Sequence, residues 1–275
     1  MLGGKEETER AKKIHFVWLL YRMHASLRGQ QYVPGWGGFI SLLGEKPARK
    51  TTLGYYPVIK HPITDYRTVK ERLRIAEEAT HEVGQDYVIT TFDLGVCMKA
   101  FPLIRNKPEV YKNHIVLMGT FHVVCAYFKM IGKKMDGSGL SEILHEAGFV
   151  SSGSVKAVLS GTNYDRALHC HKVTVEALER LMLQTFLKTK GGTDLFPKFT
   201  DDTNELLKST RDAMSIHFVQ ELLETEDVNE FLTAFSNFRE EVCEGKHGKT
   251  AMLWMSYIHY IRLVLCLVHV VKTNN

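Results

Sequence analysis

The chain has 275 residues, of which 44% are hydrophobic and 24% are charged, so it is long enough and apolar enough to bury the core of one large or two modest domains. Its 35 basic and 31 acidic residues leave a net charge of only +4, which excludes the strong overall basicity typical of many nucleic-acid-binding proteins. Its five cysteines are odd in number and lack CxxC spacing, which favours free thiols over a disulfide framework.

The N-terminal residues 1–13 are charged and lack the apolar core of a signal peptide. We therefore expect an intracellular protein, nuclear or cytoplasmic, that is not secreted. The apolar run at residues 251–271 is about long enough to span a bilayer, but it contains His259, Arg262 and His269, which are costly to place in lipid. We interpret this run as a core helix and expect no membrane partner.

The N-terminal part of the chain begins with apolar residues at helical spacing, which predict an amphipathic helix over residues 5–27. In residues 33–39, one proline and three glycines predict a structured loop, anchored by Trp36 and Phe39. Residues 53–59 are rich in strand-forming side chains and predict a strand, with Pro57 placing it at an edge of a sheet.

Strands and helices alternate from residue 53 to residue 132. The predicted strands are residues 53–59, 87–92 and 114–118, and the predicted helices are residues 66–82, 94–105 and 121–131. This order favours right-handed crossovers between parallel strands, whose carboxyl ends then lie at one edge. The sequence therefore predicts a small parallel sheet of about three strands. So few strands are near the lower limit for a stable open sheet, so either helices cover both of its faces or further strands are missing.

The pattern becomes purely helical from residue 138 onward. Glycines and capping residues divide it into predicted helices at residues 141–147, 165–188, 203–224, 227–244 and 251–271, with a further one that begins at a cap on Ser152 or Ser154 and ends at Gly161. The fold class is thus α/β followed by all-α, with an α/β domain at residues 1–137 and a helical region at residues 138–275. A candidate linker lies at residues 190–200, which contain two glycines and a proline.

Asp93 is the candidate catalytic and metal-binding residue. It directly follows the strand at residues 87–92, at the sheet edge where parallel α/β folds place their ligands. The alternative is a structural role, because an aspartate at this position also caps the helix that follows. His122 and Cys125 share a helix face and offer a weaker metal hypothesis, with a core histidine beside a buried thiol as the alternative.

Basic residues gather in the sequence around the start of the helical region. The candidate nucleic-acid-binding residues are Lys133, Lys134, Arg166 and Lys172. They predict either a solvated surface or a site for a nucleic-acid backbone.

The chain contains seven short motifs whose order and spacing resemble those of a known protein family. They are Val33-Pro34-Gly35-Trp36-x-Gly38-Phe39, Gly54-Tyr55-x-Pro57-Val58-Ile59, Phe92-Asp93, Gly119-x-Phe121-His122, Ser160-Gly161-x-x-Tyr164-x-Arg166, His171-Lys172 and Glu176-Ala177-Leu178. This series resembles a transposon-derived protein family of animal genomes, and the resemblance runs from about residue 33 to residue 275. The relatives are longer, so the chain resembles a fragment.

The resemblance implies a partial ribonuclease H-like core of the kind found in cut-and-paste transposases. In such a core, carboxylates from separate elements hold two divalent ions, Mg²⁺ or Mn²⁺, for phosphodiester chemistry. Asp93 would be the second of these acids, and the first two strands of the core would be absent. Thr120 stands where the resemblance implies a further acid, so an intact two-metal site is not expected.

The leading functional prediction is therefore a transposase-derived, catalytically inactive fragment. It would bind DNA, or a protein partner through the helical region. One alternative is a metal-dependent nuclease in which Glu142, Asp165 or Glu176 joins Asp93. The other is a structural or interaction protein in which Asp93 only caps a helix.

Overall fold

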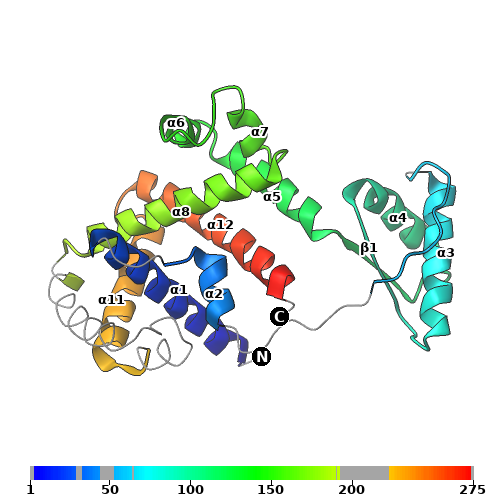
Figure 1. Cartoon of the computed structure of the whole chain (residues 1–275), viewed down its shortest axis with the longest axis horizontal. Coiled ribbons are helices and arrows are strands. Elements are labelled where there is room, and N and C mark those ends of the chain that lie inside the picture. Colours follow the sequence, from blue (N-terminus) through cyan, green and yellow to red (C-terminus); the bar gives the residue numbers. More distant parts are fainter. Residues whose placement is uncertain are drawn as a thin grey trace. The chain divides into compact units, whose positions relative to one another are not determined.

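The structure is a computed structural model that describes residues 3–28, 33–43, 53–63, 65–189, 191–192 and 223–273. It is mostly helical and contains a small parallel sheet of two strands (Figure 1), which confirms a helix-rich fold of α/β character. The chain divides into two compact units. We call residues 1–49 with 168–275 the helical unit and residues 50–167 the sheet unit.

The sheet unit is built on strands β1 (Val88–Phe92) and β2 (His114–Met118), which pair in parallel with Val88 opposite His114. Helix α4 (Leu94–Asn106) connects them, as the alternation of patterns predicted. Helix α3 (Tyr66–Glu82) precedes β1, and its N-cap is Asp65.

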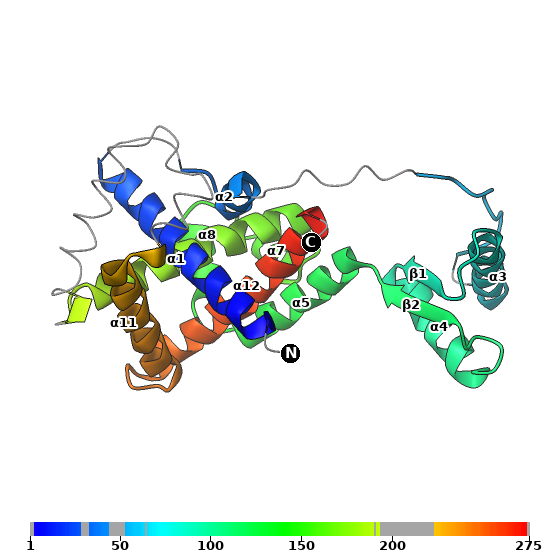
Figure 2. The ribbon, with the colours of Figure 1, turned by 90° about the horizontal axis from the view of Figure 1, so that it is seen from below.

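Helices α3 and α4 pack against one face of the sheet (Figure 2). The core between them consists of Val69, Leu73, Val96 and Ala100, each at most 2% exposed. Phe92 and Val116 extend this core from the strands, because alternate strand residues point to the same face. Burial of each large apolar side chain contributes about 1.5–3 kcal/mol to the stability of such a core.

The predicted third strand at residues 53–59 is wrong. These residues have no regular secondary structure, and their side chains are largely exposed, with Tyr55 at 93% and Val58 at 87%. Strand propensity becomes a strand only where backbone N–H and C=O groups find a ladder partner, and Pro57 also lacks an N–H to offer.

Three further helices complete the sheet unit, namely α5 (Thr120–Lys134), α6 (Leu140–Glu146) and α7 (Val155–Leu159). Glycines allow α5 to approach its neighbours closely. A Cβ at Gly132 would overlap the Leu159 backbone, and one at Gly161, whose φ is +70°, would lie 2.7 Å from the Cys125 carbonyl oxygen. A larger side chain at either position would push these segments apart.

The helical unit contains α1 (Gly3–Arg28), α2 (Trp36–Leu43), most of α8 (Tyr164–Phe186), α11 (Glu226–Cys243) and α12 (Lys249–Thr273). Helix α1 lies beside α8, α11 and α12 in both views (Figures 1 and 2). The prediction of an irregular loop at residues 33–39 is wrong from Trp36 onward. There α2 begins, and Phe39 is completely buried.

The predicted domains, residues 1–137 and 138–275, do not coincide with these two units. The division between residues 137 and 138 falls inside the sheet unit, and residues 1–49 group with the C-terminal helices. Most of the predicted linker at residues 190–200 and of the predicted helix at residues 203–224 lies outside the described residues. Within the described part of the chain, Lys249–Val268 of α12 is the one stretch that by length and composition alone is able to cross a membrane.

Candidate functional site

Asp93 is the N-cap of α4. It follows β1 directly, and its Oδ1 accepts a hydrogen bond from the Val96 backbone N–H at 2.8 Å. This bond satisfies one of the four amide groups that the first turn of a helix leaves without a partner. The structure thus shows the capping contact of Asp93, and its role as a catalytic or metal-binding residue stays a prediction.

The acids that were considered as companions of Asp93 have other surroundings. Glu142 in α6 accepts a hydrogen bond from the Ser141 hydroxyl at 2.7 Å, and Asp165 is exposed in the first turn of α8. Glu176 belongs to the helical unit, where it binds Arg22 and Arg180. Across the described ranges, no three histidine, cysteine or carboxylate side chains lie close enough together to hold a metal ion. These residues therefore do not fit the two-metal site that the family resemblance implies.

His122 and Cys125 lie on α5, as predicted. The His122 ring packs edge-on against Phe121, with centroids 5.3 Å apart. Cys125 is half-buried, and burial raises the pKa of its thiol, which disfavours the thiolate that binds metals. Their surroundings favour the packing alternative.

The four candidate nucleic-acid-binding residues are divided between the units. Lys133 and Lys134 are exposed in the last turn of α5, and Arg166 is exposed near the start of α8. All three belong to the sheet unit, whereas Lys172 belongs to the helical unit and is half-buried. Two lysines at a helix C-terminus also interact favourably with the helix dipole.

The sequence did not reveal that one face of the sheet has no cover among the described residues of the sheet unit. Ile89 of β1 is 65% exposed, and Ile115 and Leu117 of β2 are 43% and 47% exposed. They point away from the face that packs on α3 and α4, because strand side chains alternate between faces. We call Ile89, Ile115 and Leu117 the uncovered face. The signal for this face in the sequence is that each of the two short strands carries apolar residues on both of its faces.

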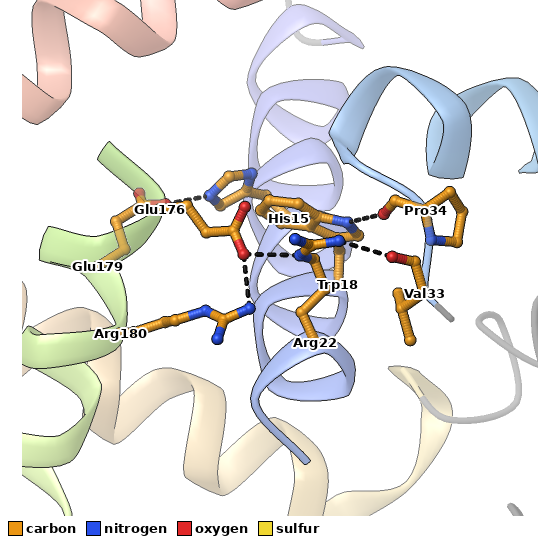
Figure 3. Close-up of polar contacts among 8 residues, drawn as sticks. All are labelled: His15, Trp18, Arg22, Val33, Pro34, Glu176, Glu179 and Arg180. Carbon is orange, nitrogen blue, oxygen red and sulfur yellow. Dashed lines mark hydrogen bonds and ion pairs between the residues drawn. The ribbon is translucent and has the colours of Figure 1, made fainter. Parts of the chain in front are cut away.

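A second feature missed from the sequence is a buried charged cluster in the helical unit. Glu179 of α8 is its centre and is fully buried. His15 of α1 contacts Glu179 Oε2 at 2.7 Å (Figure 3). On the other oxygen, Arg262 Nε of α12 lies 3.3 Å and Arg239 Nη1 of α11 lies 3.6 Å from Oε1. One residue from each of four helices therefore meets at this point.

The charges in this cluster follow from burial and proximity. Burial alone would raise the pKa of Glu179, but His15, Arg262 and Arg239 outweigh this effect and hold that pKa well below its ordinary value. Burial lowers the pKa of His15 below its ordinary value, although the neighbouring Glu179 acts in the opposite direction. Since a carboxylate only accepts, His15 Nε2–H donates the hydrogen bond and Glu179 Oε2 accepts it. Burial lowers the pKa of Arg239 to about 10, which leaves it charged.

Further polar contacts lie beside His15 and Glu179 (Figure 3). Glu176 Oε1 accepts from both Arg22 Nε and Arg180 Nη2 at 2.6 Å. On the other side of α1, Trp18 Nε1 donates to the Pro34 carbonyl at 2.9 Å, and Arg22 Nη1 donates to the Val33 carbonyl at 2.6 Å. These bonds connect α1 with α8 and with the segment that leads into α2.

Comparison with known proteins gives the chain a family. Residues 35–275 match the family described as Domain of unknown function (DUF8702). The chain belongs to this family. No curated protein and no solved structure matches it. The matched segment of the DUF8702 family begins after α1, although residues 15–21 of α1 are all buried in the helical unit.

Proposed function

We propose that the chain is a non-catalytic binding protein of transposase-like ancestry, and that it binds a protein partner through the uncovered face of its sheet unit. The observation that carries this proposal is the exposure of Ile89, Ile115 and Leu117 on two parallel strands. The predicted partner surface on the helical region is a separate hypothesis that this proposal does not need.

Parallel sheets occur almost only with both faces covered, because their connections and neighbours bury them. Here α3 and α4 cover one face, and in the described part of the chain β1 and β2 pair only with each other. A partner that lays an apolar surface on the uncovered face, or adds a strand to a free edge, would complete the sheet. The ribonuclease H-like interpretation predicts the same incompleteness, because it implies that strands are missing.

The surroundings of Asp93 support the non-catalytic part of the proposal. Its carboxylate caps α4, and the described residues contain no group of three or more histidine, cysteine or carboxylate side chains that could hold a metal ion. Two-metal phosphodiester chemistry needs several carboxylates to neutralise and space the ions.

The proposal is tested by quantitative affinity capture from nuclear and cytoplasmic extracts with the full chain. For the double variant Ile89→Glu with Ile115→Glu, the amount of specifically captured protein partner should fall by about tenfold or more, because two charges replace apolar contacts. Val110→Glu is the matched control, since Val110 is 61% exposed in the same unit but lies outside the strands. Equal capture by the double variant and the control would contradict the proposal.

The same experiment separates nucleic-acid binding, the second candidate function. Lys133 and Lys134 are exposed side by side at the end of α5, which is the observation that favours it. If captured material disappears on nuclease treatment, falls steeply with salt and requires these two lysines, the partner is nucleic acid and the uncovered face is not the binding site.

A further inference from the structure

The helical unit contains a cavity of about 200 Å³ between α8, α11 and α12. Four residues of α8, two of α11 and four of α12 form its walls, and His247 stands between α11 and α12. The α8 and α12 residues recur at intervals of three and four, so each helix turns one apolar stripe toward the cavity. We call this space the α8–α12 cavity.

The walls of the α8–α12 cavity have almost no hydrogen-bonding capacity to offer a ligand. The polar groups among its walls are the side chains of Thr185 and His247 and the indole N–H of Trp254. The Thr185 hydroxyl donates to the Leu181 carbonyl at 2.8 Å. His247 Nε2 lies 3.5 Å from a Glu241 carboxylate oxygen, and its ring packs on Phe238 at 4.9 Å. A polar ligand would lose its hydrogen bonds to water here and would find few wall groups to replace them, so the walls select an uncharged, apolar ligand.

The shape of the site favours a small molecule over a partner helix. Leu181 is 59% exposed, whereas the other apolar wall residues are half-buried or buried. A helix-binding surface would expose several apolar side chains along its length, but here they line a hollow. An enclosed apolar cavity of about 150 Å³ in a protein interior takes up benzene. The α8–α12 cavity is larger but partly open to solvent, and it has room for one or two fused rings.

The side chains around the cavity are suited to such a ligand. Phe238 and Trp254 offer aromatic surfaces, and Met182 and Met255 are flexible and polarisable, so they adapt to a ring placed between them. We propose that the α8–α12 cavity is a binding site for an uncharged, apolar small molecule the size of one or two fused rings. This inference is independent of the proposed protein partner, which concerns the sheet unit.

The test uses 1-fluoronaphthalene as the probe and the full chain with isotope-labelled methionine methyl groups. On titration, the NMR signals of Met182 and Met255 should shift in a saturable way. Met98 and Met130, which are 64% and 37% exposed in the sheet unit, should not shift. Shifts confined to Met98 or Met130, or no saturable shift at all, would overturn the inference.

A filling variant tests the site itself by the fluorine signal of the probe. Ala251→Leu places three additional carbons at the wall of the cavity and should weaken probe binding by about tenfold. Ala177→Leu is the matched control, because Ala177 is exposed on α8 and lies outside the cavity. Equal binding by both variants would also overturn the inference. If Ala251→Leu does not fold, the methionine signals of the unaltered chain still decide.

Discussion

Asp93 is either only a helix cap or also a metal ligand, and experiment can separate the two roles. Capping needs an acceptor oxygen, whereas metal binding needs the negative charge of the carboxylate. Asp93→Ala should lower the free energy of unfolding by about 1 kcal/mol, since the Val96 N–H loses its acceptor. Asp93→Asn keeps an acceptor and should cost less than half of that. Denaturation in urea, with and without Mg²⁺, measures both. Stabilisation by Mg²⁺ that disappears in Asp93→Asn would support the metal-binding hypothesis.

His171 makes stability depend on pH. Its Nδ1 lies 2.8 Å from the Tyr257 hydroxyl in the core, and burial lowers its pKa from 6.5 to about 4. The unfolded chain therefore binds this proton first, so stability is full above about pH 6.5 and falls as the pH drops toward 4, by about 3 kcal/mol in total. Burial of His15 acts in the same direction.

The variant His171→Gln removes this titration while keeping a group that can bond to Tyr257. We expect the free energy of unfolding to vary less between pH 7 and about pH 4.5 in this variant than in the unaltered chain. His169→Gln is the control on the same helix, because its side chain is exposed. A pH dependence that is the same in all three proteins would show that His171 is not the titrating group.

At the scale of elements, the parts that the sequence predicted are those whose signals are local. The strands at residues 88–92 and 114–118 and the helices between and after them follow from alternation, caps and glycines over a few residues. The segment at residues 53–59 carries equally good strand residues, but a strand requires a distant ladder partner that composition does not reveal. Asp93 was placed correctly at the end of a strand for the same local reason.

The charged cluster around Glu179 joins four helices, so its effect on stability belongs to this scale. Glu179→Gln should lower the free energy of unfolding by about 3–5 kcal/mol, because Arg239 and Arg262 then remain in the interior without a counter-charge. Glu240→Gln on the exposed side of α11 should change it by less than about 0.5 kcal/mol. Urea denaturation measures both, and a neutral Glu179→Gln would show that the arginines are not held by this carboxylate.

At the scale of the whole molecule, the role of α1 was the least predictable feature. Helical spacing predicted an amphipathic helix, but residues 15–21 are buried on every side. The reason is non-local, since His15 bonds to Glu179 across 164 positions and the Phe16 ring packs on Phe235 at 5.1 Å. Sequence patterns read over a few turns reveal which residues are apolar, but not which distant helices will enclose them.

Removal of residues 1–34 leaves the segment that matches the DUF8702 family and tests whether α1 belongs to the folded domain. The shortened chain would expose the surfaces of α8, α11 and α12 that enclose α1, and Glu179 would lose its His15 donor. We expect hydrogen exchange to show loss of amide protection throughout these three helices, while α3, α4 and the two strands keep theirs, because their core lies in the other unit. A chain that lacks only residues 1–10 is the matched control and should keep full protection. Unchanged protection after removal of residues 1–34 would mean that α1 is an accessory helix and that the family segment folds without it.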